Sequence, residues 1–266
     1  MMRFSGEMFR GLAAVGRDVW SGAVDLLLPN VCGGCEDRAT PRGQLCDACG
    51  VKLLALIALP YCPRCGATLG PNVRAYPDGC GACPSPLPRF GRVFRLGPYA
   101  PPLRNVIRRL KFYHRLGLAK KLCEMLAERI AAEGDGDLSP DVIVPVPAFW
   151  LRRFSRGLDH AALLAEHLAR ELSLPIGEEL LRVRNTPQQA QLSRTQRFAS
   201  VRGAFRTADA SALRGARVLL VDDVTTTGAT AGECARTLLQ AGVTSVQLAV
   251  LAKAEAPTAY TQHWET

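Results

Sequence analysis

The sequence predicts an α/β protein in which a parallel sheet carries helices on both faces and follows a small metal-stabilised module. Three observations predict this fold class. Short runs of β-branched residues and leucine, without the polar alternation of a half-exposed strand, are separated by segments with helical periodicity. Eight cysteines form four Cys-x-x-Cys pairs before residue 84. One apolar run ends at two acidic residues and a threonine-rich turn, at the kind of strand end where open α/β sheets bind ligands.

Length, composition and charge narrow the classes of function. The chain has 266 residues and 48% hydrophobic content, enough for a substantial core in one large or two modest domains. Lys and Arg number 33 against 24 acidic residues, which gives a net charge of +9. This excess suits phosphate-bearing small molecules, nucleic acid or an acidic protein partner, and it does not choose among them.

Residues 1–27 are predicted to form an amphipathic helix, because apolar residues recur there at helical spacing. We expect this helix to dock on its own protein, with attachment to a membrane surface as the alternative. The charged residues within the stretch argue against a signal peptide. No segment is long and apolar enough to predict a membrane span. A cytoplasmic location is therefore expected.

The cysteine pairs predict two structural zinc sites in a module over residues 28–88. A Cys-x-x-Cys turn directs two thiolates at one tetrahedral ion, and a second such turn completes the site. Pairing in chain order gives two zinc ribbons, but an interleaved pairing of first with third and second with fourth is also open. Disulfides between these cysteines would need an oxidising compartment. The presence of four Cys-x-x-Cys pairs argues against a thioredoxin-like redox pair. The spacing of the cysteines is also unusual for an iron–sulfur cluster. The predicted zinc ligands are Cys32, Cys35, Cys46, Cys49, Cys62, Cys65, Cys80 and Cys83.

Residues 89–266 are predicted to form the α/β domain. Residues 92–96 indicate a short strand, and residues 103–132 show the periodicity of a helix rich in Arg and Lys. Residues 141–147 indicate a second buried strand that stops at prolines, and residues 158–172 have helical spacing again. The expected order is therefore strand, helix, strand, helix, as in a parallel sheet with helical connections.

The loop after the second predicted strand carries Arg152, Arg153 and Arg156, and Ser155 within it could cap the following helix. Arginine suits phosphate recognition because its guanidinium forms bidentate bonds to phosphate oxygens. Residues 180–206 are polar and basic with few apolar positions. They predict a mobile loop or flap that could close over a substrate, with a disordered linker as the alternative.

The most informative string runs from Val218 to Thr230. Its first part, with Arg217, indicates a buried strand over residues 217–221, and Asp222 and Asp223 follow at the carboxyl end. The threonines of the turn supply backbone N–H groups and hydroxyls, and its one glycine lets the backbone approach a ligand. A helix over residues 229–240 would then present its N-terminus to an anion. A last strand is indicated after it, over residues 245–252.

The residue types in this string suit a 5-phosphoribosyl group, which offers one phosphate monoester and two neighbouring hydroxyls. The turn can hold the phosphate, and the carboxylates can accept hydrogen bonds from the hydroxyls and help to place Mg²⁺. The simpler alternative is a strand followed by a capped turn. The full string resembles the motif of type I phosphoribosyltransferases that binds phosphoribosyl pyrophosphate (PRPP). The resemblance assigns PRPP binding to Asp222, Asp223, Thr225, Thr226, Thr227, Gly228, Ala229 and Thr230.

Taken together, the motifs resemble those of the ComF family, in the group with an N-terminal double zinc ribbon, from about Leu26 to Lys253. The resemblance implies a type I phosphoribosyltransferase-like fold, two structural zinc ions, and Mg²⁺ bound with PRPP. It also makes Arg152, Arg153 and Arg156 candidates to hold pyrophosphate. The matching segments beyond the cysteines and the PRPP motif are Pro98-Tyr99, Leu110-Lys111-Phe112, Val144-Pro145-Val146-Pro147, Arg156-Gly157, Thr186-Pro187-Gln188-Gln189, Leu192, Arg197 and Ala204-Phe205.

Two segments depart from the family pattern. The family's Arg-Gly-Phe-Asn-Gln is replaced by Arg156-Gly157-Leu158-Asp159-His160, and Ser200 stands where Asn is common. The carboxylate of Asp159 would repel a pyrophosphate if it pointed into the site.

The resemblance implies a link to the uptake of single-stranded DNA during natural transformation, and two hypotheses follow. In the first, the protein is a transferase that acts on PRPP, with His114 or His160 as weak candidates for a base and no catalytic residue assigned. In the second, it is a non-catalytic accessory protein that holds single-stranded DNA or a helicase partner through its basic helix and zinc ribbons. Because only 6% of residues are aromatic, phosphate contacts would then dominate over base stacking.

Overall fold

The computed structural model describes residues 31–35, 37, 40, 44–76, 78–113, 116–134, 139–148, 159–186, 193–209 and 211–255. Several predicted features lie outside these residues, namely the helix over 1–27, His114, and the loop with Arg152, Arg153, Ser155 and Arg156. Within the described part of the chain, no helix combines the length and the apolar character that a membrane span requires.

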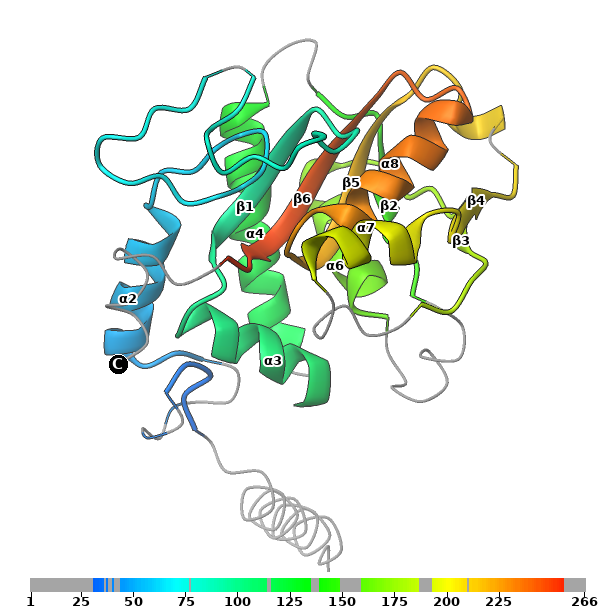
Figure 1. The fold of residues 1–266 in the computed structure, drawn as a ribbon. Helices are drawn as coiled ribbons and strands as arrows, with labels where there is room; N and C mark the ends of the chain where they lie inside the picture. The colour runs from blue at the N-terminus through cyan, green and yellow to red at the C-terminus, as the bar shows by residue number, and fades with distance from the viewer. Residues whose placement is uncertain are drawn as a thin grey trace, which may run out of the picture.

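A four-stranded parallel sheet lies at the centre of the protein (Figure 1). Its strands are β1 (Arg92–Pro98), β2 (Val142–Pro145), β5 (Arg217–Thr225) and β6 (Ser245–Lys253), in the spatial order β1-β6-β5-β2. Each coincides with a predicted strand and all pairings are parallel, so the predicted fold class is confirmed. β5 pairs with β6 on one side and β2 on the other. The residues that follow β5 therefore lie at the carboxyl edge of the sheet, between the ends of two other strands.

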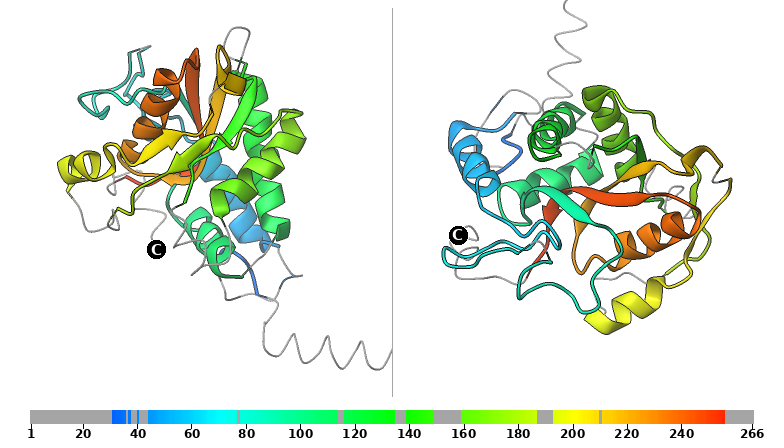
Figure 2. Two further views of the ribbon diagram at one scale, coloured as in Figure 1. Left: turned by 90° about the vertical axis from the view of Figure 1, so that its right-hand side faces the viewer. Right: turned by 90° about the horizontal axis from the view of Figure 1, so that it is seen from above.

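Helices cover both faces of this sheet (Figures 1 and 2). On one face lie α4 (Leu116–Glu133) and α6 (His160–Leu172), with α3 (Leu103–Tyr113) at the carboxyl edge; α8 (Ala229–Gln240) covers the other face. Successive side chains of a strand point to opposite faces. Phe94, Leu219 and Ala249 therefore pack towards α4 and α6, and Val93, Leu220 and Leu248 towards α8.

The prediction of one helix over residues 103–132 is wrong, because α3 ends at Tyr113 and α4 begins at Leu116. The two helices run in different directions, with α4 along the sheet and α3 across its lower edge in Figure 1. One straight helix could not bury both apolar faces. The shared periodicity hid the change of direction, because both segments repeat apolar residues at the same spacing.

The prediction that residues 180–206 form a mobile loop or a linker is also wrong for the residues described. β3 (Leu180–Arg182) and β4 (Phe205–Thr207) pair as an antiparallel ribbon, and α7 (Arg194–Val201) lies between them in the chain. A capping box closes the start of α7, since Ser193 accepts from the amide of Gln196 and the Gln196 side chain accepts from the amide of Ser193. Strands of three residues are too short to show periodicity, so the polar composition misled the prediction. A 3-10 helix, η3 (Ser211–Leu213), leads towards β5.

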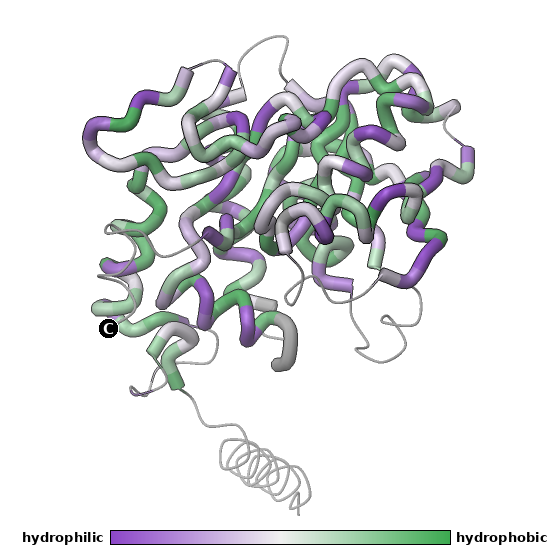
Figure 3. The backbone as a smooth tube through the Cα atoms, in the orientation of Figure 1, coloured by the Kyte–Doolittle hydropathy of each residue, from purple (hydrophilic) through white to green (hydrophobic). Residues whose placement is uncertain are grey.

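The N-terminal module shares the main core of the protein. Its helix α2 (Asp47–Ile57) buries Leu53 and Leu56 in the same cluster as Phe94 and Leu96 of β1. The predicted metal-stabilised module therefore also draws on the core of the sheet. In Figure 3 hydrophobic residues follow the central strands and their facing helices, while hydrophilic residues gather on the outer loops.

Candidate functional site

The eight predicted zinc ligands form two groups in chain order. Cys32, Cys35, Cys46 and Cys49 bring their sulfur atoms within 4.8 Å of one another, and so do Cys62, Cys65, Cys80 and Cys83. This arrangement decides for two consecutive ribbons and against the interleaved pairing. All ten cysteines are free thiols rather than disulfides.

The spacing of the sulfur atoms fits zinc. The Sγ atoms of Cys62 and Cys83 are 3.8 Å apart, as are those of Cys65 and Cys80. Tetrahedral zinc with bonds of about 2.3 Å separates its sulfur ligands by about 3.8 Å. Four thiols would fill the coordination shell of a tetrahedral ion in each group, which fits structural zinc and would leave no position for a substrate.

Backbone amides support the thiolate form of Cys32 in the first group. The amides of Gly34 and Cys46 donate to Cys32 Sγ at 3.3 and 3.2 Å. Burial alone would raise the pKa of this thiol, but amide donors from Cys46, Cys35 and Gly34 outweigh it and lower the pKa of Cys32 to about 6. In the second group, the amide of Cys80 donates to Cys83 Sγ at 3.3 Å.

The acidic pair lies within β5 rather than after it. The strand was expected to end at Val221, but Asp222, Val224 and Thr225 continue the pairing with β6, opposite Val250, Ala252 and Lys253. Neighbouring strand residues point to opposite faces. The carboxylate of Asp223 therefore borders a small, largely apolar pocket with His160 between α3 and α6, whereas Asp222 lies on the α8 face, where its charge acts on Cys234.

The turn between β5 and α8 is held at both ends. The carbonyl oxygen of Thr225 accepts from the amide of Ala254 at 2.8 Å, and that of Thr226 accepts from Lys253 Nζ. Gly228 has a φ of +77° and is the N-cap of α8, where it provides no side-chain cap. Thr227 Oγ1 accepts from the amide of Ala229 at 3.3 Å. The first turn of α8 thus presents backbone N–H groups and the positive end of the helix dipole at the sheet's carboxyl edge, an arrangement suited to an anion.

Sequence reasoning missed residues that support this turn from elsewhere in the chain. A Cβ atom added to Gly228 would lie 3.2 Å from Phe90 Cζ and 3.3 Å from Pro88 Cγ, so these two side chains form the floor of the turn. No local motif marks Phe90, Pro88 or Lys253, because their role depends on contacts with residues more than 25 positions away.

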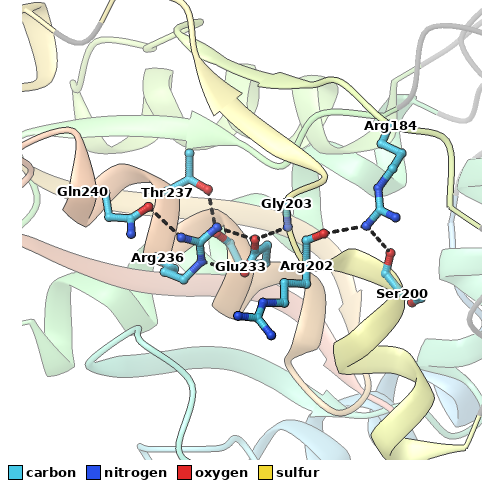
Figure 4. Close-up of polar contacts among 8 residues, drawn as sticks. All are labelled: Arg184, Ser200, Arg202, Gly203, Glu233, Arg236, Thr237 and Gln240. Atoms are coloured by element: carbon cyan, nitrogen blue, oxygen red, sulfur yellow. Dashed lines mark hydrogen bonds and ion pairs between the residues drawn. The ribbon is translucent and has the colours of Figure 1, made fainter.

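The ribbon of β3 and β4 is joined to α8 by a polar cluster (Figure 4). Glu233 of α8 accepts from the amide of Gly203 at 2.6 Å and pairs with Arg236 at 2.6 Å. Arg184 donates to the carbonyl oxygens of Ser200 and Arg202 at 3.0 and 2.5 Å. These contacts hold the end of α7 against the helix whose start forms the candidate anion site.

Comparison with known proteins agrees with this architecture. Residues 112–266 match the phosphoribosyl transferase domain family, and residues 23–84 match the double zinc ribbon domain family. Competence protein F of Haemophilus influenzae is 33% identical over 217 residues, which cover 80% of this chain and 92% of the relative. The chain belongs to the ComF family.

Two further similarities can be placed beside this ComF-family chain. The DNA utilization protein YhgH of Salmonella typhi is 32% identical over 228 residues, covering 84% of this chain and 96% of the relative. Among solved structures, the glutamine PRPP amidotransferase of B. subtilis has 24% identity and a TM-score of 0.34, over 51% of this chain and 26% of that one.

The departure of this ComF-family chain at Asp159 has a structural explanation. Asp159 is the N-cap of α6, and its Oδ1 accepts from the amide of Ala162 at 3.3 Å. A carboxylate at this position satisfies a free amide and favours the helix dipole. The expected cap, Ser155, lies outside the described residues. His160 becomes the first residue of α6, and Ser200 donates to the carbonyl oxygen of Arg197 at 2.9 Å within α7.

A groove of about 500 Å³ runs along the outer side of α8. Its floor is apolar, with contributions from Pro88, Leu87, Phe198 and Val201. Its charged lining residues are Arg64, Arg89, Arg236 and Glu233. Because Glu233 is paired with Arg236, the lining carries a net positive charge and would attract an anionic group.

Proposed function

We propose that this ComF-family protein binds a 5-phosphoribosyl ligand of the PRPP type together with Mg²⁺, in a role connected with DNA uptake or utilisation. The names of its relatives, a competence protein and a DNA utilization protein, support the biological setting. The observation that carries the binding proposal is the segment from Thr225 to Thr230. It leaves the end of the interior strand β5 and passes through Gly228 into the first turn of α8. Free cysteines in two groups of four support a reducing, cytoplasmic location.

Each group of the ligand has a proposed partner. The 5-phosphate would accept hydrogen bonds from the amides and hydroxyls between Thr226 and Thr230. Asp222 and Asp223 are the proposed acceptors for the ribose hydroxyls, and because they lie on opposite faces of β5 they would approach the ribose from different sides. Mg²⁺ would supply charge neutralisation at the pyrophosphate oxygens. Arg152, Arg153 and Arg156 remain the candidates to bind pyrophosphate.

Transferase activity is a separate part of the proposal. Stabilisation of the leaving pyrophosphate would do most of the work in such a reaction. His160 borders the same small pocket as Asp223, which keeps it as a candidate for proton transfer, and we assign no catalytic residue.

The test is titration of the purified, zinc-loaded protein with PRPP in the presence and absence of Mg²⁺, followed by calorimetry and thermal unfolding. We expect a rise in the midpoint of unfolding that grows with PRPP concentration, because a ligand of the folded state stabilises it by mass action. Asp222→Asn combined with Asp223→Asn should abolish this rise while zinc content stays at two ions. Absence of any shift with the unchanged protein at millimolar PRPP would contradict the proposal.

A second candidate function is a non-catalytic accessory role in which the protein holds single-stranded DNA or an acidic segment of a helicase partner. The positively charged groove beside α8 favours it. Arg89→Glu should weaken binding of a single-stranded oligonucleotide, and wild-type affinity should fall steeply with salt because phosphate contacts release counterions. Lys52→Glu on the exposed face of α2, outside the groove lining and with the same change of charge, is the control. If no oligonucleotide binds at low salt, direct DNA binding is excluded and the partner protein remains.

A further inference from the structure

The two cysteine groups contact different parts of the protein. The first group lies against α3 and α4. Asn105 Nδ2 donates to the carbonyl oxygen of Gly34 at 2.6 Å, and a Cβ atom added to Gly33 would lie 2.7 Å from Leu118 Cδ1. The second group lies beside β1, where the amide of Val93 donates to the carbonyl oxygen of Pro63 at 2.7 Å. From there, two sets of contacts lead to the turn between β5 and α8.

The first set passes through Arg64, the residue between Cys62 and Cys65 that lies next to Cys65. Its guanidinium donates to the carbonyl oxygen of Phe90 at 2.5 Å and also to that of Gly91. Phe90 is 1% exposed, and its ring is packed against Gly228. The Cys-x-x-Cys turn from Cys62 to Cys65 is therefore hydrogen-bonded to the segment whose Phe90 ring packs against Gly228.

The second set passes through the residues after Cys65. The amide of Thr68 donates to Glu255 Oε2 at 3.0 Å, and the Thr68 hydroxyl donates to Glu255 Oε1. Gly66 has a φ of +74°, and a Cβ atom added there would lie 3.8 Å from Lys253 Cδ. The chain from Lys253 to Glu255, held in this way, provides both donors to the carbonyl oxygens of Thr225 and Thr226.

The two carbonyl contacts determine where the amides of the turn point. In a trans peptide, the C=O and the following N–H point in opposite directions. Because Thr226 directs its carbonyl oxygen at Lys253, the amide of Thr227 points to the other side of the turn. The same holds for the Thr225 carbonyl and the amide of Thr226. Loss of either donor would free the peptide planes to rotate and would misdirect the amides.

We propose that the second four-cysteine group is a structural part of the anion site, and that Arg64, Phe90 and Lys253 are positioning residues for the turn from Thr225 to Thr230. With zinc bound, the four thiolates would hold the turn from Cys62 to Cys65 in the conformation that positions both Arg64 and Thr68 for their contacts. Within the described residues, the contacts of the first four-cysteine group go to α3 and α4, so we assign this group no such role. The part of this inference that concerns ligand affinity rests on the proposed binding of PRPP.

The structural part is tested by hydrogen exchange on the full-length protein without ligand. Cys62→Ser with Cys65→Ser disables the second group, and Cys32→Ser with Cys49→Ser is the matched control in the first. Arg64→Gln and Lys253→Met keep all eight thiols. They test the positioning of the turn even if a cysteine variant does not fold. We expect exchange of the amides of Ala254 and Gly232, which donate to the carbonyl oxygens of Thr225 and Gly228 at the two ends of the turn, to rise by about tenfold or more in the second-group, Arg64 and Lys253 variants, as expected for local opening, and to stay at the wild-type rate in the control.

The functional part is tested by titration of the same variants with PRPP and Mg²⁺. Arg64→Gln and Lys253→Met should weaken binding by about tenfold, equivalent to about 1.4 kcal/mol, while zinc content remains at two ions. Wild-type exchange rates in the turn of both variants would overturn the inference, and so would an equal rise in the first-group control. If the unchanged protein does not bind PRPP but the exchange pattern is as expected, the proposed function fails while the positioning role is supported.

Discussion

Lys253, the last residue of β6, donates a hydrogen bond from Nζ to the carbonyl oxygen of Thr226 in the turn after β5. The lysine is 8% exposed, so its ammonium group is held within the protein and directed at the turn. The contact joins the ends of two adjacent parallel strands at the carboxyl edge of the sheet. It places a fixed positive charge beside the segment that we propose binds a phosphate.

The turn should tolerate no side chain at position 228. Gly228→Ala would place a Cβ atom 3.2 Å from Phe90 and force an alanine into a left-handed conformation. We expect a loss of about 1–3 kcal/mol in the free energy of unfolding, measured by urea denaturation. Gly50→Ala is the control, because Gly50 lies inside α2 with no atom within 4 Å of an added Cβ. It should stabilise the protein by about 0.5–1 kcal/mol, and equal losses in both variants would contradict this explanation.

Glu233 should make stability depend on acidity. Burial opposes its charged form, but hydrogen bonds from Arg236 and from the amide of Gly203 outweigh burial and lower the pKa of this carboxyl group below its usual value. Because the pKa of Glu233 is lower in the folded than in the unfolded protein, the ionised carboxylate contributes to the free energy of unfolding. This contribution is fully present above the unfolded-state pKa of about 4.3, and it is lost as the pH falls through the folded-state pKa.

Glu233→Gln should therefore be less stable than wild type at pH 7, by about 1–3 kcal/mol, because a charged hydrogen-bond partner is removed from a nearly buried site. The difference between the two proteins should shrink below about pH 4. Chemical denaturation at several pH values measures it. A difference that does not change with pH would show that the carboxylate charge has no part in holding α7 to α8.

Asp159 should act as a helix cap rather than as a ligand of pyrophosphate. Asp159→Ala removes the acceptor for the amide of Ala162 and should cost about 1 kcal/mol of stability, whereas Asp159→Asn keeps an acceptor and should cost less. If PRPP binding is detected, Asp159→Asn should leave its affinity unchanged. A large gain in affinity on removal of the charge would instead indicate that the carboxylate faces the ligand.

The features predicted correctly from sequence are those encoded by neighbouring residues. The start and end of α8 match the predicted helix over residues 229–240, because the string around Gly228 combines a turn residue with the following periodicity. The central strands were visible as apolar runs, since both of their faces are buried. The Cys-x-x-Cys pairs identified the eight cysteines that gather in two groups, because a tight turn between two thiols is a local feature.

Other features were missed because local patterns do not contain them. The extension of β5 through Asp222 to Thr225 depends on pairing with β6, and polar residues at a strand end do not show that pairing. β3 and β4 are too short to leave a periodic signal. The capping role of Asp159 was missed because the helix was expected to begin earlier, with Ser155 as its cap, whereas α6 begins at His160.

By itself, the sequence determined the family, the order of the central strands along the chain, the identity of the cysteine ligands and the residues of the candidate phosphate turn. Only the tertiary structure decided which cysteines gather into one group, which face of the sheet each acidic residue occupies, and how Arg64, Phe90 and Lys253 support the turn. The physical reason is that these arrangements depend on strand register and on contacts between residues far apart in the chain. Such contacts form only when the whole sheet and the ribbon beside it are assembled.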